Sequence, residues 1–511
     1  MRGPHNILRL ARTGATFERS GAMRTALEKL EVPPNVRIAA RILGWPFKWL
    51  GLRGDPNQPP VVRAITALGP AYIKFGQLLS TRPDVVGPDM AVELRVLQDK
   101  LPPFPTAQAK KIIEDEIGRP IDQIFSRFDE PIAAASIAQV HKATLAATGD
   151  QVAVKVIRPN IEAAFRRDID AFYFAASMIE LISPATRRLK PSDVVGHFDA
   201  TCKGELDLRM EAAGASQYYD NTRQDQGFRV PKIFWNNSSK SVLTMEWIDG
   251  VSFGDLDALQ ATGQDLNELG KRLLTKFLKH ALRDGYFHAD LHQGNLKLAP
   301  NGDLVALDFG IMGRIDEYTR RVYAGILMGF IQRDYRRVAE LHFEAGYVPA
   351  DRNIDDFAQA LRSVGEPIFG QDASQISMAR LLAHLFDVTE RFGMETRLEL
   401  ILLQRTMVVV EGVSRYLNPH LNIWEVAQPV VEDYIRTYLG PRAIARDLRI
   451  TAEVISRFGP RLPEIVENLL EKGLEKPTKP RARRLRMLPA IGWSIAGAVI
   501  ASGLWALSFL F

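Results

Sequence analysis

Cysteine is nearly absent from this chain of 511 residues, because Cys202 is the single one. An intramolecular disulfide is therefore excluded, and the composition fits a reducing compartment. No group of cysteine and histidine residues has the spacing of a structural zinc site. The chain also lacks a Walker A sequence, and its soluble part lacks G-x-G-x-x-G, so a P-loop and a dinucleotide site are unsupported. Hydrophobic residues make up 46% and charged residues 24%, which indicates a globular chain long enough for more than one domain.

Acidic residues are scarce at the two ends of the chain. Residues 1–53 hold ten Lys and Arg against three acidic residues, and residues 472–486 hold seven against Glu475 alone. The formal net charge is +5, so the two ends together carry +13 and the body between them carries −8. This distribution argues against nucleic acid and suits an anionic membrane surface, where each basic residue contributes about 1 kcal/mol. It predicts an amphipathic basic helix near the N-terminus, either solvated or lying on the membrane.

Charged residues are absent from residues 487–511. A helix of this length, at about 1.5 Å per residue, spans a hydrocarbon core of about 30 Å. The basic run at 479–486 flanks it on one side only, so the positive-inside rule predicts a single C-terminal span in the cell inner membrane and a cytoplasmic body. A buried core helix or a hydrophobic hairpin is the alternative interpretation. Small residues at four-residue spacing in this segment could pack against a second helix, so a homodimer is among the expected assemblies.

Two short blocks carry the chemistry. The first reads His-Ala-Asp-Leu-His-Gln-Gly-Asn and contains Asp290 and Asn295, and the second reads Leu-Asp-Phe-Gly and contains Asp308. A protein-kinase site needs a catalytic-loop Asp, an Asn five residues later for one Mg²⁺, and a DFG Asp for the other. We therefore predict that Asn295 and Asp308 hold the metal and that Asp290 orients a water or an acceptor hydroxyl. Residues 304–307 are predicted to form the strand that joins the two blocks.

A second interpretation exists for the first block. His288, Asp290 and His292 alternate, and in a strand this alternation would place three metal ligands on one face. That arrangement leaves Asn295 and Asp308 without a role.

Lys155 stands in the predicted strand 152–157, whose Val-Ala-Val-Lys sequence matches the kinase strand that holds the α- and β-phosphates. A kinase-like site also needs a helix carrying an acidic partner for this lysine. The candidates are Glu205, Asp207 and Glu211, which cannot all share one helix face. We favour Glu211 over Glu205 as the partner.

An alanine-rich segment occupies the position of the kinase Gly-rich loop. Alanine restricts φ and adds a methyl group, so this loop should be stiffer than a glycine loop and contact phosphates differently. A small-residue packing turn is the other interpretation. The segment predicted to contact the nucleotide comprises Ala133, Ala134, Ala135, Ser136, Ile137, Ala138, Gln139 and Val140.

The predicted strand 242–248 ends where a kinase has the hinge between its lobes. The backbone around Met245, Glu246 and Trp247 is therefore the predicted adenine contact.

These residues together resemble the UbiB family of atypical kinase-like ATPases, also called the aarF-domain family. The family marker K-x-G-Q is present as Lys74-Phe75-Gly76-Gln77, followed by Ser-Thr-Arg-Pro-Asp at 80–84 and Gln-Asp at 98–99. The resemblance implies that Lys74 and Gln77 lie near Glu205 and Asp207 over the active site. It further implies ATP hydrolysis or action on a lipid-like molecule, and it disfavours protein phosphorylation.

The sequence agrees with that implication, since no A-P-E motif follows the second block. Two positions depart from the family pattern. Ala138 replaces a glycine common in the family's loop, and Gly214 stands where many members carry Asn.

The predicted fold class is α+β, a bilobal protein-kinase-like fold with a family-specific N-terminal helical extension, a mostly helical C-terminal region and a C-terminal transmembrane helix. The predicted segments are basic N-terminal helices at 1–60, the K-x-G-Q extension at 61–130, the smaller lobe at 131–250, the larger lobe core at 251–345, C-terminal helices at 346–471, a basic linker at 472–486 and the membrane helix at 487–511.

The functional hypothesis is a membrane-anchored, Mg²⁺-dependent ATPase that supports ubiquinone biosynthesis. By resemblance its ligands and partners are ATP or ADP, Mg²⁺, anionic membrane lipid, polyprenyl-phenol precursors of ubiquinone and other proteins of that pathway. A lipid or small-molecule kinase and a nucleotide-binding scaffold of the biosynthetic complex are the alternatives. Family members are often named 2-polyprenylphenol 6-hydroxylase, but no flavin fingerprint, haem ligand set or facial triad supports oxygen chemistry here.

Overall fold

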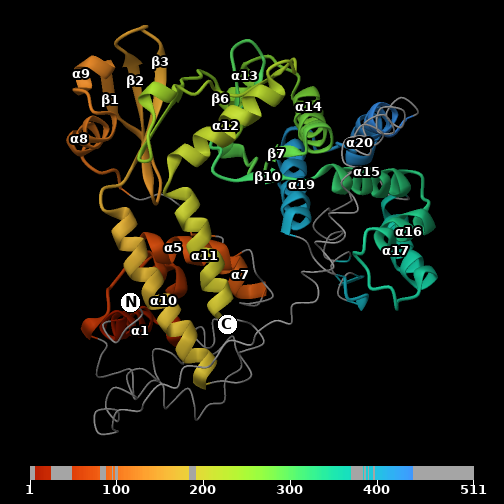
Figure 1. The fold of residues 1–511 in the computed structure, drawn as a ribbon, viewed down its shortest axis with the longest axis horizontal. Helices are drawn as coiled ribbons and strands as arrows, with labels where there is room; N and C mark the ends of the chain where they lie inside the picture. The colour runs from red at the N-terminus through yellow and green to blue at the C-terminus, as the bar shows by residue number, and fades with distance from the viewer. Residues whose placement is uncertain are drawn as a thin grey trace, which may run out of the picture. The chain divides into compact units, whose positions relative to one another are not determined.

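The computed structural model describes residues 6–24, 49–80, 88–94, 96–97, 102–182, 191–369, 384, 387–388, 391–394 and 398–440. They divide into two compact units (Figure 1). The first unit contains the described residues up to Ala212 together with Ile233–Trp247, and the second contains Ala213–Lys232 and the described residues from Ile248 onward.

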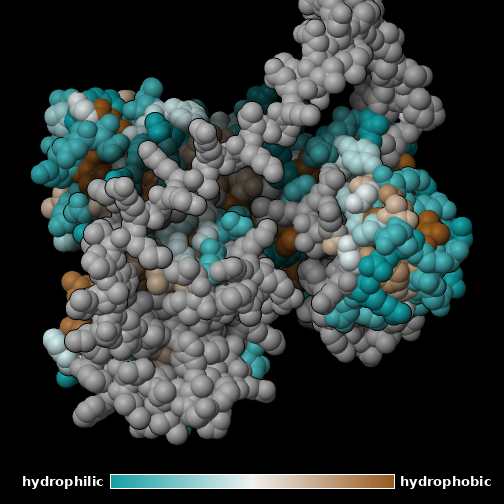
Figure 2. Space-filling view, turned by 60° about the horizontal axis from the view of Figure 1, so that its bottom comes forward, coloured by the Kyte–Doolittle hydropathy of each residue, from teal (hydrophilic) through white to brown (hydrophobic). Residues whose placement is uncertain are grey.

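Several predicted features lie outside the described residues. They are the membrane helix at 487–511, the basic linker at 472–486, the segments 81–84 and 98–99 of the family pattern, and residues 1–5 and 25–48 of the basic N-terminal region. Across the ranges that are described, no helix combines the length and the apolar character needed to span a bilayer. The coloured surface in Figure 2 is mainly hydrophilic, with hydrophobic residues in scattered patches.

A group of packed helices forms one part of the first unit. Phe75 brings three of these helices together, because its ring lies 4.9 Å from that of Phe172 and 5.0 Å from that of Phe198. Aromatic rings at these distances pack more favourably than their buried area alone accounts for. The helices are α1 (Asn6–Ser20), α4 (Pro60–Leu68), α5 (Pro70–Ser80), α7 (Pro88–Leu94), α10 (Ile161–Ile182) and α11 (Pro191–Glu205), with α10 and α11 side by side in Figure 1.

The N-terminal helix α1 is packed inside this unit. Its Leu10 and Phe17 are buried, and the Thr13 hydroxyl lies 2.7 Å from the hydroxyl of Tyr72 on α5. The predicted amphipathic basic helix is therefore present as α1, and its buried face supplies part of the unit's own core.

A four-stranded antiparallel sheet in the order β1-β2-β3-β5 forms the other part of the first unit. Its strands are β1 (Phe125–Ala134), β2 (Ala138–Leu145), β3 (Gln151–Ile157) and β5 (Val242–Glu246), and the helices α8 (Thr106–Ile117) and α9 (Ile121–Ile124) accompany it.

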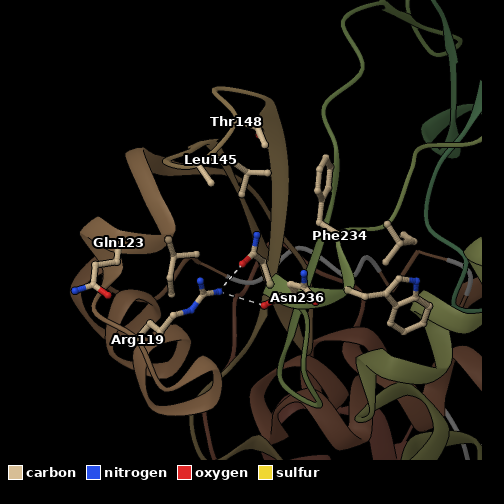
Figure 3. Close-up of a pocket in the computed structure, with 11 residues that line it drawn as sticks. Arg119, Gln123, Leu145, Thr148, Phe234 and Asn236 are labelled. Carbon is tan, nitrogen blue, oxygen red and sulfur yellow. Dashed lines mark hydrogen bonds between the residues drawn. The ribbon is translucent and has the colours of Figure 1, made fainter.

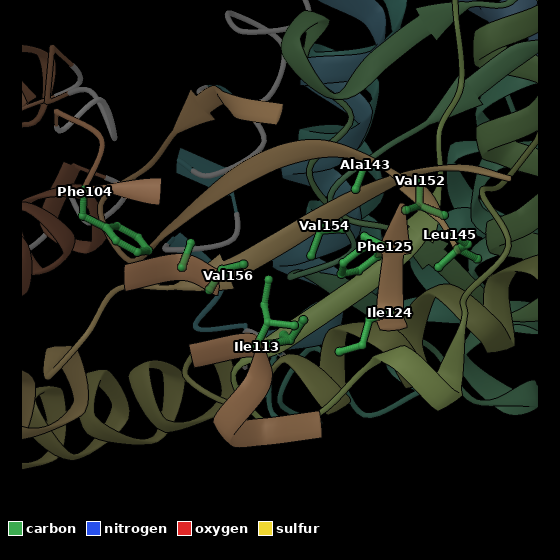
Figure 4. Close-up of a cluster of buried hydrophobic side chains, with 11 residues drawn as sticks. Phe104, Ile113, Ile124, Phe125, Ala143, Leu145, Val152, Val154 and Val156 are labelled. Atoms are coloured by element: carbon green, nitrogen blue, oxygen red, sulfur yellow. The ribbon is translucent and has the colours of Figure 1, made fainter. Parts of the chain in front are cut away.

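The core of this sheet lies between its strands and α8. Ile113 of α8 and the alternating residues Val152, Val154 and Val156 of β3 are fully buried in one cluster, drawn in Figure 4. The period of two is what a half-buried strand requires. Because β1 begins at Phe125, the predicted start of the smaller lobe at 131 falls inside a strand.

Helix α12 (Leu208–Thr222) begins in the first unit and ends in the second. The second unit holds a sheet in the order β4-β9-β8-β6 and an antiparallel pair β7-β10. These strands are β4 (Phe228–Arg229), β6 (Val251–Ser252), β7 (Tyr286–His288), β8 (Leu296–Leu298), β9 (Leu304–Ala306) and β10 (Met312–Arg314).

Most of the second unit is helical, as predicted. Capping aspartates begin several of its helices; Asp265, for example, accepts bonds from the N–H groups of Asn267 and Glu268. The helices are α13 (Leu256–Ala261), α14 (Leu266–Lys279), α15 (Glu317–Ile331), α16 (Tyr335–Glu344), α17 (Ile354–Phe369), α19 (Leu398–Leu417) and α20 (Ile423–Tyr434).

A buried histidine in this helical region predicts acid sensitivity. His342 of α16 is packed against Phe357, with its Nδ1 2.7 Å from the carbonyl oxygen of Val338, and burial lowers its pKa to about 4. Since the folded-state pKa lies below the unfolded value of 6.5, the unfolded state binds the proton first as the pH falls. The free energy of unfolding therefore keeps its full value above pH 6.5 and decreases as the pH falls toward 4. Urea unfolding at pH 7 and pH 4.5 should show a loss of about 2 kcal/mol from this residue.

The variant His342→Phe keeps a ring in the site and removes the titrating group. Its free energy of unfolding should fall less steeply between pH 6.5 and 4.5 than that of the unchanged protein. If the free energy of unfolding falls equally steeply in both proteins, folding does not lower the pKa of His342.

Candidate active site

Lys155 and Glu211 form a buried ion pair in the first unit. The Lys155 Nζ lies 2.9 Å from both carboxylate oxygens of Glu211, and the two side chains are 13% and 8% exposed. Strand β3 positions the lysine, and the first turn of α12 positions the glutamate. Glu211, the favoured candidate, is thus a partner of Lys155, as a kinase-like phosphate site requires.

The other two acidic candidates lie elsewhere. Glu205, the last residue of α11, pairs with Lys74 of the K-x-G-Q helix α5 at 2.9 Å. Asp207 lies between α11 and α12 and is bonded to Arg209, which lowers the pKa of its carboxyl. Gln77 donates from its side-chain amide to the carbonyl of Leu97 at 3.3 Å. The implied approach of Lys74 to Glu205 is therefore present.

The alanine-rich segment is a tight turn between β1 and β2. The N–H of Ala135 donates to the carbonyl of Ala138 at 2.8 Å, and Ser136 and Ala138 are almost completely buried. Gln139 is fully buried, and its amide is bonded to the backbone of Phe104. Its side chain therefore faces the interior of the unit, so the prediction that Gln139 contacts a nucleotide is wrong for the side chain.

The segment predicted as the hinge comprises the end of the edge strand β5 and Trp247, the residue after it. Met245 pairs with Ala153 of β3 and is buried. The N–H of Trp247 donates to the carbonyl of Gln151 at 3.0 Å, so this donor is used within the sheet. The indole ring of Trp247 lies under the ammonium group of Lys142 at 4.6 Å.

The second unit brings Asn295 and Asp308 together through the hairpin β8-β9. Leu296 pairs with Ala306, and the N–H of Leu307 donates to the carbonyl of Asn295 at 2.8 Å. The last residue before β8 and the second residue after β9 therefore lie at the same end of one hairpin. The predicted strand at 304–307 is present as β9.

The backbone of Asp308 has a left-handed conformation with φ of 56°. This region is uncommon for residues other than glycine, although Asp and Asn enter it more readily than most. The next side chain, Phe309, is buried and lies 5.5 Å from the ring of His288. Gly214 of α12 approaches this segment closely, since a Cβ there would lie 3.5 Å from the carbonyl oxygen of Phe309 and 3.2 Å from Met312. The glycine found in place of the family's Asn thus occupies a tight position.

Asp290 belongs to a loop that is held by His288. The His288 Nε2 donates to the carbonyl of Leu307 at 2.9 Å, and its Nδ1 accepts from the N–H of Asp290 at 3.1 Å. Burial lowers the pKa of His288, which agrees with this neutral form. His292 caps the turn at Gln293–Asn295 by accepting from the N–H of Gly294.

The alternative metal site at His288, Asp290 and His292 is therefore wrong. Strand β7 ends at His288, whose two nitrogens already have partners, so the three side chains do not share a strand face. In the part of the chain that the structure describes, no group of three or more His, Cys, Asp and Glu side chains could hold a metal.

The residues at the end of the β8-β9 hairpin fit Mg²⁺. The side-chain amide of Asn295 donates to the carbonyl of Asp290 at 3.0 Å, which leaves its Oδ1 as the ligand atom. Mg²⁺ prefers oxygen ligands and commonly takes one or two from the protein and the rest from phosphates and water. Asn295 and Asp308 would hold it, and the bound ion would neutralise charge on the phosphates of a nucleotide.

A buried polar network supports this region, and sequence reasoning missed it. The His280 Nε2 donates to Asp225 at 3.0 Å, and its Nδ1 accepts from the Tyr218 hydroxyl at 2.7 Å. Although burial alone would raise the pKa of Asp225, bonds from His280, Arg283 and Lys279 hold it well below its usual range. The ring of Tyr218 lies 6.2 Å from that of Phe309, so the network packs under the second catalytic block.

Helix α19 also contacts the catalytic loop. The buried hydroxyl of Thr406 lies 3.0 Å from the carbonyl oxygen of Ala289 and 2.7 Å from that of Leu402. Thr406→Val keeps the shape and removes this bond. We expect a loss of about 1 kcal/mol in stability and a several-fold fall in nucleotide turnover, because the residue before Asp290 loses its support.

Ser414→Ala is the matched control for this variant. Ser414 is a buried hydroxyl of the same helix, and its Oγ has no hydrogen-bond partner among the described residues. Turnover and thermal unfolding are measured for both variants. Turnover should be lower in Thr406→Val than in Ser414→Ala. Equal turnover in both would show that the bond to Ala289 does not position the loop.

One pocket of about 420 Å³ lies on the first unit and contains none of the predicted site residues. Its rim includes Arg119, whose guanidinium donates to the side-chain oxygen of Asn237 at 2.8 Å (Figure 3). Leu145 and Phe234 contribute apolar surface to the same pocket. The pocket is thus separate from the Lys155–Glu211 pair.

Two family models match this chain. The model of the ABC1 atypical kinase-like domain matches residues 96–342, and the model of the UbiB helical domain matches residues 361–422. Among solved structures, the complex of Rv3197 with erythromycin from Mycobacterium tuberculosis aligns with a TM-score of 0.50 and 25% identity, covering 70% of this chain and 90% of that one.

Several curated relatives carry the name "Probable protein kinase UbiB". The protein from Marinobacter nauticus is 40% identical over 468 residues, which cover 90% of this chain and 84% of the relative. The protein from Pseudomonas putida is 38% identical over 484 residues, which cover 91% and 88% of the two chains. Identity at this level over nearly the whole of both chains shows that the chain belongs to the UbiB family of atypical kinase-like proteins.

Proposed function

We propose that this protein is a Mg²⁺-dependent ATPase that acts at the membrane in support of ubiquinone biosynthesis. The observation that carries the nucleotide part is the buried pair of Lys155 and Glu211, with both oxygens of the carboxylate 2.9 Å from the ammonium group. A lysine held in this way is pre-oriented for the α- and β-phosphates of ATP.

The residues of the two catalytic blocks have separate roles in this proposal. Asn295 and Asp308 hold the metal at the end of the β8-β9 hairpin. Asp290 orients the attacking water, and its backbone is fixed by His288 and Asn295. Catalysis then rests on positioning and on stabilisation of charge that develops on the transferred phosphoryl group.

Water is the favoured acceptor because of the K-x-G-Q helix. Lys74 is paired with Glu205 within the same unit as the Lys155–Glu211 pair. By resemblance, this extension covers the region where a protein kinase accepts a peptide. That arrangement supports hydrolysis over transfer to protein.

The membrane and ubiquinone parts rest on sequence and on resemblance. The uncharged segment 487–511 and the basic run before it support anchoring. An anchored ATPase could present polyprenyl-phenol intermediates at the bilayer surface, where these lipids are held by their apolar tails.

A protein-kinase activity is the second candidate, because curated relatives are named "Probable protein kinase UbiB". In that case Asp290 would accept the proton of a substrate hydroxyl instead of orienting a water.

The deciding experiment follows the labelled γ-phosphate of ATP. The full chain is placed on anionic liposomes that contain a polyprenyl-phenol, and free phosphate, lipid and protein are counted separately. Release as free phosphate, with a loss of about 10²-fold in Asp290→Asn, supports the ATPase. Transfer to lipid or to protein makes the protein a kinase. Tight nucleotide binding without turnover indicates a scaffold.

A further inference from the structure

The alanine-rich loop is hydrogen-bonded to a proline-rich segment that precedes it in the chain. This segment, Pro102-Pro103-Phe104-Pro105, is called the strap below. Three of its four residues are prolines, which fix φ and have no backbone N–H, so the strap is stiff and Phe104 carries its single backbone donor. The ring of Phe104 is buried at one end of the hydrophobic cluster in Figure 4.

Gln139 binds both backbone groups of Phe104. Its Oε1 accepts from the Phe104 N–H at 2.9 Å, and its Nε2 donates to the Phe104 carbonyl at 3.2 Å. The second hydrogen of Nε2 points to the Nε2 of His141 at 2.8 Å, and the Nδ1 of His141 donates to the carbonyl of Asp129 at 2.8 Å. Every donor and acceptor in this chain of bonds has one consistent assignment, so the Gln139 amide is held in a single orientation.

Arg158 makes the second connection. Its Nε donates to the carbonyl of Ala135 at 3.0 Å, and one terminal nitrogen donates to the carbonyl of Pro102 at 2.9 Å. Its backbone N–H donates to the carbonyl of Ile137 at 2.9 Å, and its guanidinium lies over the ring of Phe104 at 5.8 Å. One arginine therefore contacts two residues of the loop and two residues of the strap.

We propose that Arg158 is a positioning residue that holds the alanine-rich loop against the strap and thereby sets the affinity for the nucleotide. This inference rests on the proposed nucleotide site. A glycine loop reaches phosphate through its conformational freedom, whereas an alanine loop has little of it. Residues outside the loop must then fix the position of its N–H groups. The bonds of Arg158 to the carbonyl groups of Ala135 and Ile137 provide this constraint.

The test compares two arginine variants of the full chain. Arg158→Met removes the bonds to Ala135 and Pro102 and keeps an apolar stem over Phe104. Arg119→Met is the matched control, because Arg119 is also an arginine of the first unit that bonds a backbone carbonyl, that of Asn236 at 3.3 Å, beside the pocket of Figure 3. Arg158→Lys restores one of the two bonds.

Two readouts are taken. The first is the Kd for a fluorescent ATP analogue with Mg²⁺, and the second is hydrogen exchange at the backbone amides of residues 133–138. We expect Arg158→Met to raise the Kd by about tenfold and to speed exchange in the loop, with Arg158→Lys in between and Arg119→Met unchanged in both. The thermal unfolding midpoint of each variant shows that it is folded.

An unchanged Kd in Arg158→Met, or the same change in Arg119→Met, would overturn the proposal. If the unchanged protein binds no ATP analogue, the proposed function fails and the role in nucleotide affinity fails with it. The exchange data would still report separately whether Arg158 holds the loop, so the two failures are distinguishable.

Discussion

Asp308→Asn should lower nucleotide turnover by about 10³-fold while leaving the fold intact. The substitution removes one negative charge from the end of the β8-β9 hairpin, where Asp308 and Asn295 are the predicted oxygen ligands for Mg²⁺. Asparagine tolerates the left-handed backbone that Asp308 adopts at φ of 56°, so little conformational strain is added. The loss should therefore come from weaker metal binding and not from unfolding.

The measurement is the rate of phosphate release as a function of Mg²⁺ concentration. Asp303→Asn serves as the control, since Asp303 lies in the turn at the other end of the same hairpin and bonds Asn301. The Asp303 variant should follow the unchanged protein, whereas the Asp308 variant should need far more Mg²⁺ for any turnover. A loss below about tenfold in Asp308→Asn would rule out Asp308 as a metal ligand that matters for the rate.

Features that local sequence patterns encode were predictable. The strand with Lys155, the strand between the catalytic blocks and the order Asp290, Asn295, Asp308 all follow from short-range spacing, and the structure places the last two residues at one end of a hairpin. The choice of Glu211 as partner of Lys155 needed more than spacing, because three acidic residues stood within seven positions. The rule that a helix carries the partner of the lysine did not by itself distinguish Glu211 from the other two.

Contacts between distant parts of the chain could not be predicted in this way. Thr406 reaches the catalytic loop across 117 positions, and Tyr218 reaches His280 across 62. Threonine on a helix and histidine in an apolar stretch are common, and neither pattern says which distant backbone group will be the partner. The same holds for the basic segment of α1, whose charges indicated a membrane surface although its apolar face is buried in the first unit.

Gln139 shows a different limit of prediction from sequence. Its position in the alanine-rich loop predicted a nucleotide contact, but strand β2 turns its side chain inward, where the backbone of Phe104 is its partner. Strand residues alternate between two faces, so neighbours in one motif need not point toward the same ligand. A stretch of three prolines around a single N–H was the available signal, because that buried donor required an acceptor.

Lys155→Met should abolish most turnover and also destabilise the protein, and these two effects should be separable. The ammonium group and the Glu211 carboxylate are 13% and 8% exposed, so removal of the lysine leaves a buried carboxylate that has lost its ion pair. Breaking a buried pair in this way costs about 3 kcal/mol or more in the free energy of unfolding. Turnover should fall by about 10²-fold to 10³-fold, because the α- and β-phosphates lose their cation.

The double variant Lys155→Met with Glu211→Gln separates the two effects. Neutralising the glutamate removes the buried charge that Lys155 had balanced, so about half of the lost stability should return, while turnover should stay as low as in Lys155→Met alone. The control pair is Lys240 with Glu162, at 2.7 Å and about half exposed, where the corresponding changes should cost less than about 1 kcal/mol and leave turnover unchanged. Denaturant unfolding and phosphate release on the same preparations give both quantities. Recovery of turnover in the double variant would mean that Lys155 serves the fold and not the nucleotide, because a neutral pair restores packing but cannot hold phosphate.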